Sequence, residues 1–225
     1  MRRGLALLCL ALTGALQASE TPDEGAGMTA LRYVDQDPGD AAYPTRILVT
    51  PDFLRMDAGK DDGDFVLLDR RQRQVTNVMR DSGLAMVFTW KDAPRPPTTW
   101  KPELRTAPAA PGTRRFSLVV NGVVCSEGIV APRLAPDAAR AMAELKAVLA
   151  ATQYRVWKDS PAEMQHGCDL ANEVWEADAL FSLGVPLEAR EFSGRTRRLE
   201  SESKLPRAPE LFRVPQGLTA INAPS

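Results

Sequence analysis

The chain has 225 residues, with 28 Lys and Arg against 29 Asp and Glu, and its net charge is −1. This balance argues against a nucleic-acid partner, which requires a strong basic excess, and it gives no electrostatic attraction to anionic lipid surfaces. The length suffices for one well-packed core and is short for two.

The first 18 residues, MRRGLALLCLALTGALQA, have the pattern of a cleaved signal peptide. Arg2 and Arg3 are followed by a mostly apolar stretch over residues 5–12, far short of the ~20 residues that span a bilayer. Cleavage would remove both arginines and no acid, which moves the net charge from −1 to −3. We therefore expect export to a bacterial periplasm, a flexible N-terminus over residues 19–27, and no membrane span after cleavage.

The stretch from Met28 to Trp90 consists of short runs in which apolar and polar residues alternate. Phe53–Asp57 is one such run, and residues 58–64 (AGKDDGD) read as a hairpin loop before the next. Period-two runs joined by tight polar turns are typical of an antiparallel meander. The turns are too short for the crossover that parallel strands need. The sequence therefore predicts a mainly β (α+β) protein.

Residues 92–112 contain six prolines, and this segment is predicted to be a loop because proline lacks a backbone donor. A hairpin follows over residues 116–125 (FSLVVNGVVC), since Asn121-Gly122 tolerates the positive φ values of a two-residue type I′ turn. One amphipathic helix is predicted from Pro136 to Thr152, with an acidic residue in its first turn.

The C-terminal third returns to a β pattern. Residues 173–180 (EVWEADAL) fit either a strand or a short helix, whereas residues 183–204 read as two strands around Ser193-Gly194. Residues 209–218 carry three apolar anchors, Leu211, Phe212 and Val214. We expect one domain over residues 28–218 and a C-terminal tail over residues 219–225.

Three cysteines are present, and Cys9 would leave with the signal peptide. The remaining pair, Cys125 and Cys168, is predicted to form a disulfide because an even pair in an exported chain meets oxidising conditions. Two free buried thiols are the alternative. A bridge across 43 positions would stabilise the fold by at most about 4 kcal/mol.

The predicted elements and three segments of the sequence resemble a known family. The segments are residues 183–194 (LGVPLEAREFSG) and residues 209–218 (PELFRVPQGL), and a third, residues 65–78 (FVLLDRRQRQVTNV), precedes a cysteine-containing strand. The chain resembles the LolA/LolB-like lipoprotein-carrier fold, closest to its uncharacterised periplasmic relatives. This resemblance implies a curved antiparallel half-barrel sheet with helix packed on its concave face, where carriers of this fold bind acyl chains. Residues 92–112 have no counterpart in that resemblance.

Several polar residues are candidates for a catalytic or metal site. His166 lies two positions before Cys168, but a cysteine in a disulfide is no nucleophile, so a loop histidine without a role is expected. Four aspartates could hold calcium, yet their spacing lacks the alternation of an EF-hand loop and favours a solvated turn (Asp57, Asp61, Asp62 and Asp64). The arginine groups are expected on solvated faces or sheet edges (Arg70, Arg71 and Arg73; Arg114 and Arg115; Arg195, Arg197 and Arg198).

No hydrolase, phosphate-loop, dinucleotide or zinc motif is present, so we expect no enzyme activity, no metal and no cofactor. The sequence favours a non-enzymatic binding or carrier module for a lipid, an acyl chain or a lipidated envelope partner. The alternative is an interaction protein whose groove is filled by its own helix. An apolar groove is expected along one strand face and one helix face (Leu84, Met86, Phe88 and Trp90; Met142, Leu145 and Leu149), although the same strand stripe also fits ordinary core.

Overall fold

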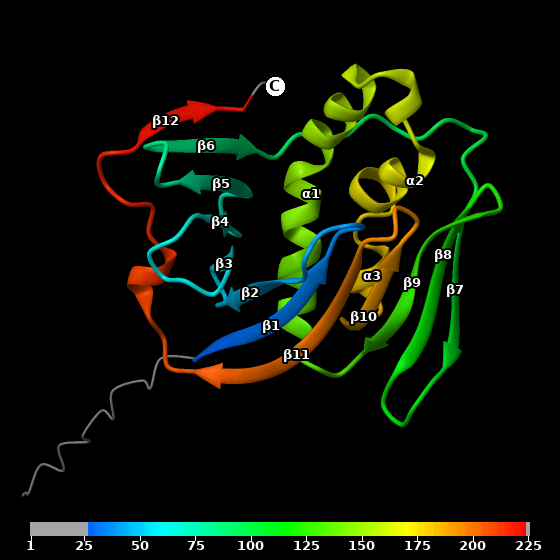
Figure 1. Ribbon diagram of the computed structural model, residues 1–225, viewed down its shortest axis with the longest axis horizontal. Helices are drawn as coiled ribbons and strands as arrows, with labels where there is room; N and C mark the ends of the chain where they lie inside the picture. Colours follow the sequence, from blue (N-terminus) through cyan, green and yellow to red (C-terminus); the bar gives the residue numbers. More distant parts are fainter. Residues whose placement is uncertain (1–26, 224–225) are drawn as a thin grey trace, which may run out of the picture.

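A single curved sheet dominates the computed structural model, which describes residues 27–223 (Figure 1). The predicted signal peptide, and all but Gly27 of the predicted flexible N-terminus, lie outside the described residues. The strand order is β12-β6-β5-β4-β3-β2-β1-β11-β10-β9-β8-β7. The strands are β1 (Met28–Gln36), β2 (Tyr43–Val49), β3 (Phe53–Asp57), β4 (Phe65–Asp69), β5 (Gln74–Met79), β6 (Leu84–Thr89), β7 (Pro102–Pro108), β8 (Arg114–Val120), β9 (Val123–Ala131), β10 (Val185–Glu191), β11 (Thr196–Leu205) and β12 (Thr219–Asn222).

One long helix and several short helical turns accompany the sheet. They are α1 (Pro136–Asp159), η1 (Ala162–Met164), α2 (Gly167–Leu170), η2 (Ala171–Trp175), α3 (Ala179–Ser182) and η3 (Pro209–Phe212). Of the two structures that residues 173–180 allowed, the helical one is therefore observed. Among residues 27–223 no helix is both long and apolar enough to cross a membrane.

The predicted meander is confirmed, because each strand from β1 to β6 pairs antiparallel with the next. The hairpin of β8 and β9 is confirmed as well. Asn121 and Gly122 adopt φ values of 51° and 86°, which the type I′ turn requires. The C-terminal strands join the meander through β11, which pairs with β1, so the first strand lies in the middle of the sheet.

Two segments predicted as irregular contain strands. The proline-rich segment includes β7, which pairs with β8 and forms one edge of the sheet. Its prolines at positions 102 and 108 stand at the two ends of the strand, and an edge strand needs backbone donors on one side only. The predicted C-terminal tail includes β12, which pairs parallel with β6 at the other edge. The sheet is therefore antiparallel except for this one pair.

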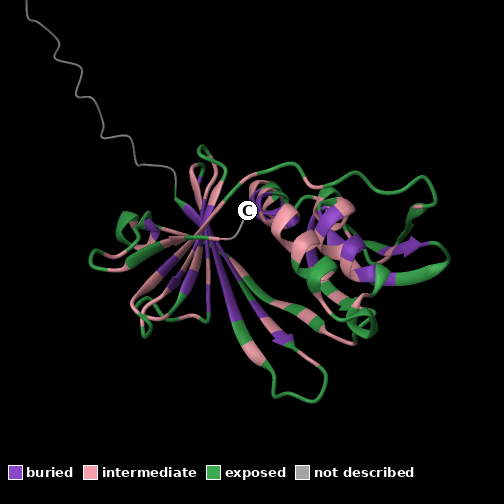
Figure 2. Cartoon of the chain, turned by 90° about the horizontal axis from the view of Figure 1, so that it is seen from above, coloured by how far each residue is buried: buried purple, intermediate pink, exposed green. Residues whose placement is uncertain are grey.

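Helix α1 covers the concave face and extends to Asp159, seven residues beyond the predicted end. Pro136 occupies the first turn, where its missing donor costs no hydrogen bond. Figure 2 shows the helices lying between the meander strands and the β7–β9 strands, with buried residues along the strands that face them. This core contains residues of β1 to β5, β10 and α1 (Leu31, Tyr33, Ile47, Val49, Leu54, Leu68, Val75, Ala138, Ala139, Ala141, Met142, Leu145, Val148 and Val185).

The convex face of the meander has a smaller core beneath η3. Phe212 is buried there and lies 6.0 Å from the ring of Phe53, and Leu211 packs beside them. Both residues anchor the C-terminal segment as predicted. Val214, the third expected anchor, is 40% exposed and does not belong to this core.

Strands β9 and β10 approach each other closely at Gly128. A Cβ atom at this position would lie 2.0 Å from the backbone oxygen of Glu188, closer than any side chain can come. The pairing register of β9 and β10 also shifts between Pro186 and Glu188. Only glycine permits this close approach, which brings the C-terminal strands around the helical segment.

Candidate functional site

An apolar cavity of about 250 Å³ lies beside α1, on the side that faces β8 to β11. One wall is formed by α1, a second by the segment from η2 to α3, and the floor by the sheet. Its apolar lining comes from all three (Ile47, Met56, Leu104, Phe116, Leu118, Met142, Leu145, Leu149, Ala177, Leu180, Phe181, Pro186 and Ala189). Leu104 on β7 is 37% exposed, so the lining includes a solvent-accessible side chain on an edge strand.

The structure separates the two halves of the predicted groove. Met142, Leu145 and Leu149 of α1 line the cavity. The strand stripe of β6 and the residue after it (Leu84, Met86, Phe88 and Trp90) lies on the other side of α1 and contributes nothing to the cavity lining. The helix therefore divides the concave face into a packed half and a hollow half.

The apolar residues of the β6 stripe lie in the packed half of the concave face. Phe88 and Trp90 pack against the core beneath α1, and Leu84 and Met86 are partly buried on the same strand face. The guanidinium of Arg73 lies 3.7 Å from the centroid of the Trp90 ring and covers it. Ordinary core packing thus explains Phe88 and Trp90.

Sequence reasoning missed the floor of the cavity. Phe116 and Leu118 alternate in a predicted strand, so the sequence indicates that they share one face of it. The sequence does not indicate which element packs against that face. Leu104 lies in the proline-rich segment, which was predicted to be a loop. The remaining wall residues, Leu180 and Phe181, belong to the segment for which strand and helix were both open. The helix face was detectable because its periodicity is local, whereas the opposing walls depend on contacts distant in sequence.

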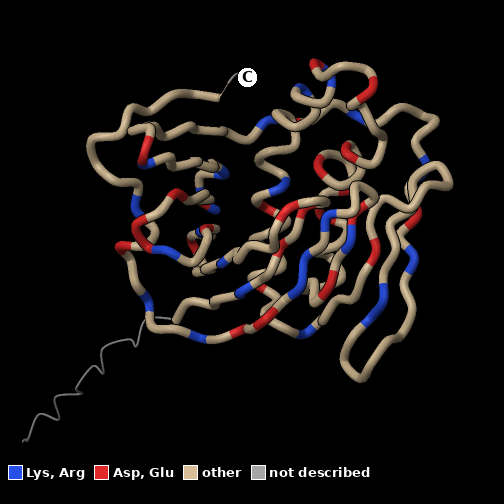
Figure 3. The backbone as a smooth tube through the Cα atoms, in the orientation of Figure 1, with Lys and Arg blue, Asp and Glu red and all other residues tan. Residues whose placement is uncertain are grey.

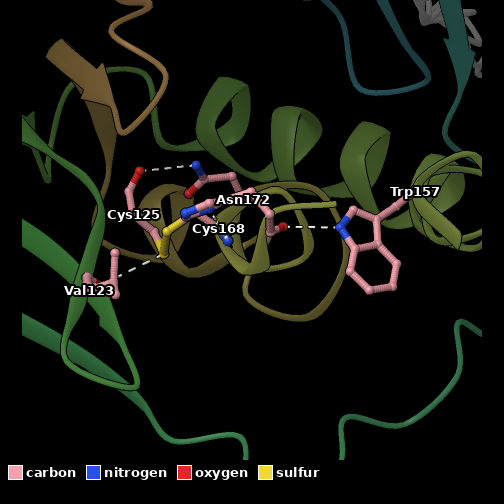
Figure 4. The surroundings of a disulfide bond; sticks show 6 residues. Val123, Cys125, Trp157, Cys168 and Asn172 are labelled. Atoms are coloured by element: carbon pink, nitrogen blue, oxygen red, sulfur yellow. Dashed lines mark hydrogen bonds between the residues drawn. A yellow bond between two sulfur atoms is a disulfide. The ribbon is translucent and has the colours of Figure 1, made fainter. Parts of the chain in front are cut away.

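A disulfide fixes one wall of the cavity. Cys125 on β9 and Cys168 on α2 are bonded, with sulfur atoms 2.02 Å apart, which confirms the predicted pair (Figure 4). The side-chain amide of Asn172, which lines the cavity, donates a hydrogen bond of 3.2 Å to the backbone oxygen of Cys125. Together these bonds hold the helical segment against β9.

His166 has a structural role, so the expectation of a histidine without one is wrong. Its Nδ1 accepts a hydrogen bond of 3.1 Å from the backbone N–H of Cys168 and so caps α2. Its ring stacks on Phe192 at 4.3 Å between centroids. Its backbone oxygen accepts a bond from the indole of Trp157 at the end of α1. These contacts position Cys168 for its disulfide.

Arg70 clamps α1 to the sheet, contrary to the expected solvated position. Its side chain is 9% exposed and donates two hydrogen bonds of 2.9 Å to Asp137 and two of 2.6 and 3.1 Å to Glu144. A further bond of 3.0 Å reaches the backbone oxygen of Thr50. These carboxylates, Glu144 foremost, raise the pKa of Arg70. The first and third turns of α1 are thereby tied to the turn between β4 and β5.

The predicted solvated aspartate turn is partly a buried ionic network. Asp57 is buried and accepts hydrogen bonds from Arg46 at 2.8 and 2.9 Å and from Arg55 at 2.6 Å. Arg46 also reaches Asp61 at 2.6 Å. Arg55 is almost fully buried and donates to the backbone oxygen of Leu211, which links β3 to η3. No group of metal-ligating side chains occurs among residues 27–223.

Charged residues gather at one end of the cavity. Lys146 of α1 and Glu173 of η2 form an ion pair of 2.5 Å. Arg197 of β11 donates two hydrogen bonds of 2.7 Å to buried Asp35. Burial alone would raise the pKa of Asp35, but Arg197 and the hydroxyl of Thr45 outweigh it and hold the pKa below its ordinary value.

No protein-family model matches the chain, and no curated protein matches it. Among solved structures, the chain is similar to an uncharacterized conserved protein from Thermus thermophilus (TM-score 0.41, 11% identity, 89% of this chain and 93% of that chain). It is also similar to PNGF-II (TM-score 0.42, 12% identity, 88% and 31%) and to a LolA superfamily protein from Nitrosomonas europaea (TM-score 0.30, 9% identity, 84% and 89%). All three TM-scores are below 0.5, so the function has to be argued from the cavity.

Proposed function

We propose that this protein is a non-enzymatic periplasmic binding module whose cavity beside α1 takes an alkyl or acyl chain, either of a free lipid or of a lipidated partner. The observation that carries the proposal is the apolar cavity of about 250 Å³ bounded by α1, the η2–α3 segment and the sheet. An ordinary protein core leaves no empty space of this size, because native interiors are packed to the density of organic crystals.

The size of the cavity suits a chain of this kind. An apolar cavity of about 150 Å³ stays dry and binds a benzene-sized molecule. The cavity here is larger, and its lining includes the partly exposed Leu104 on the edge strand β7. Each methylene group moved from water into the cavity stabilises the complex by about 0.8 kcal/mol.

The disulfide supports the proposed location. Disulfides persist in oxidising compartments and are rare in reducing ones. The bond between Cys125 and Cys168 agrees with the signal-like start of the sequence, and both point to a protein that works outside the cytoplasm.

A binding role fits the polar side chains of the cavity better than catalysis. Ser126 of β9 and Glu191 of β10 are cross-strand partners and line the same cavity. A serine nucleophile would need a hydrogen bond to a base. Within residues 27–223 no hydrogen bond joins these two side chains.

A second candidate is an interaction protein whose concave face is filled by its own helix. The packing of Phe88 and Trp90 in the core beneath α1 favours it for the meander half of the sheet. The two candidates differ in whether the other half takes a ligand.

Titration with N-phenyl-1-naphthylamine, an uncharged dye that fluoresces in apolar sites, separates the candidates. The delipidated wild-type protein should bind about one dye molecule, and dodecanol should displace it. Leu104→Asp and Leu180→Asp place a charge in the cavity wall and should each weaken binding about tenfold or more. Val156→Asp is the matched control, because Val156 is 58% exposed on α1 and does not line the cavity.

Near-ultraviolet circular dichroism verifies that each variant is folded. Dye binding that is absent from the folded wild type, or equal in Leu104→Asp, Leu180→Asp and Val156→Asp, would contradict the proposal and favour the filled-groove candidate.

A further inference from the structure

The charged end of the cavity has one carboxylate that the protein itself leaves without a partner. Glu191 stands at the end of β10, where its backbone N–H donates to the oxygen of Arg195 at 2.9 Å and so closes the β10–β11 turn. Its side chain lines the cavity. Within residues 27–223 no hydrogen bond or ion pair involves its carboxylate oxygens.

The cations of the cavity are all engaged elsewhere. Lys146 pairs with Glu173 at 2.5 Å, and Arg197 forms its two bonds with Asp35. Arg195, in the turn after Glu191, lies 3.6 Å from Asp37 and 4.0 Å from Asp35. Figure 3 shows basic and acidic residues interspersed along β10 and β11.

The remaining carboxylate of the lining is also occupied. Glu176 accepts a hydrogen bond of 3.1 Å from the indole N–H of Trp100. The cavity lining thus holds three carboxylates and three cations (Glu173, Glu176 and Glu191; Lys146, Arg195 and Arg197), and two of the cations pair with Asp35 and Asp37 outside the lining. Because the cations of the lining pair with other carboxylates, the partly buried Glu191 carboxylate favours a cation or a hydrogen-bond donor beside it, since an unpaired charge in such a site is costly.

We infer that Glu191 binds the head group of the ligand, and that this ligand is an amphiphile whose chain ends in a primary ammonium group. The inference rests on the proposed function and adds the chemical class of the ligand to it. The alkyl chain lies against α1 and the floor of the cavity, and the ammonium group donates hydrogen bonds to the Glu191 carboxylate. An alkyl carboxylate meets a like charge there and binds more weakly than an uncharged chain.

The protonation of Glu191 gives the interaction a pH dependence. Burial raises the pKa of Glu191, and the negative charge of Glu173 on η2 raises it further. The positive charges of Lys146 on α1 and of Arg195 and Arg197 lower this pKa and offset part of the rise. Glu191 therefore loses its charge at a higher pH than an ordinary glutamate as the solution is acidified. Ammonium binding should strengthen as pH rises through this pKa, whereas binding of an uncharged chain should not change with it.

The test compares three probes with the same twelve-carbon chain, namely dodecylammonium, dodecanol and dodecanoate, each below its micelle concentration. Wild-type protein should bind dodecylammonium about tenfold tighter than dodecanol, the effect of one charge-assisted hydrogen bond, and dodecanoate more weakly than dodecanol. In Glu191→Gln the preference for dodecylammonium should fall to about twofold or less, with dodecanol binding unchanged. Glu188→Gln is the control, because Glu188 is exposed on the opposite face of β10.

The outcomes distinguish a failure of the Glu191 assignment from a failure of the proposed binding function. If none of the three probes binds, the proposed function fails. If dodecanol binds and dodecylammonium binds no better, or dodecanoate binds best, the cavity is real and the assignment of Glu191 is wrong. Equal effects of Glu191→Gln and Glu188→Gln would likewise overturn the assignment.

Discussion

Replacing Arg70 by methionine removes the ionic clamp on α1 and keeps most of the apolar stem of the side chain. The variant loses the hydrogen bonds to Asp137, to Glu144 and to the backbone oxygen of Thr50. It leaves both carboxylates able to hydrate, because Asp137 and Glu144 are 47% and 36% exposed. The experiment asks whether α1 is a fixed wall of the cavity.

The expected loss in the free energy of unfolding is about 2 kcal/mol. Two ion pairs with partly exposed partners contribute about 0.5 kcal/mol each after screening by solvent. The hydrogen bond to Thr50 adds about 1 kcal/mol. Core packing of α1 through Met142, Leu145 and other buried residues remains, so the variant should fold.

Urea denaturation followed by circular dichroism measures this loss, with an unchanged dependence on urea concentration. Arg71→Met is the matched control, because Arg71 is 78% exposed, pairs with Asp52 and should change stability by less than about 0.5 kcal/mol. In 1 M salt, where screening acts over about 3 Å, the difference between wild type and Arg70→Met should shrink. A loss below about 0.5 kcal/mol would refute the clamp and show that packing alone holds α1.

Three further predictions concern the frame around the cavity. The double variant Cys125→Ala, Cys168→Ala should lose up to about 4 kcal/mol of unfolding free energy in urea, given the separation of 43 residues, and an unchanged midpoint would contradict the stapling role. Gly128→Ala should lower the melting temperature and reduce the free energy of unfolding by about 2–4 kcal/mol, because the alanine Cβ would lie 2.0 Å from the backbone oxygen of Glu188. A variant that melts like the wild type would show that β9 and β10 can separate at this position. The pKa of Asp35 is lowered on folding, so its stabilising effect is complete above about pH 4, the unfolded value, and is lost as pH falls through the folded pKa. Urea titrations from pH 7 to pH 3 should show this acid-side loss in wild type and a smaller one in Asp35→Asn; equal slopes would refute it.

The meander and the helix were predictable because their signals are local. Alternation over five to seven residues gave strands such as Phe53–Asp57, and Asn121-Gly122 gave the hairpin with its turn type. Strands β7 and β12 were missed for a physical reason. Each is an edge strand held by pairing with a distant segment, so neither its prolines nor its length had to meet the demands of a central strand.

The cavity was only half predictable. The face of α1 with Met142, Leu145 and Leu149 followed from helical periodicity, but its opposite wall was sought on β6. The sheet order decides this question, because β8 to β11, with one residue each of β2, β3 and β7, line the cavity and β6 does not. The burial of charged side chains such as Arg70 was not predictable either, since it depends on partners far away in sequence.

Native mass spectrometry of the disulfide-bonded protein purified from a bacterial periplasm, followed by organic extraction, tests the binding cavity most directly. Each wild-type chain should carry about one acyl- or alkyl-chain species, which should be absent from Leu180→Asp protein prepared in parallel. A wild-type mass equal to the bare chain, with no gain after incubation with dodecylammonium or dodecanol, would contradict the account and leave α1 as a permanent filling of the sheet.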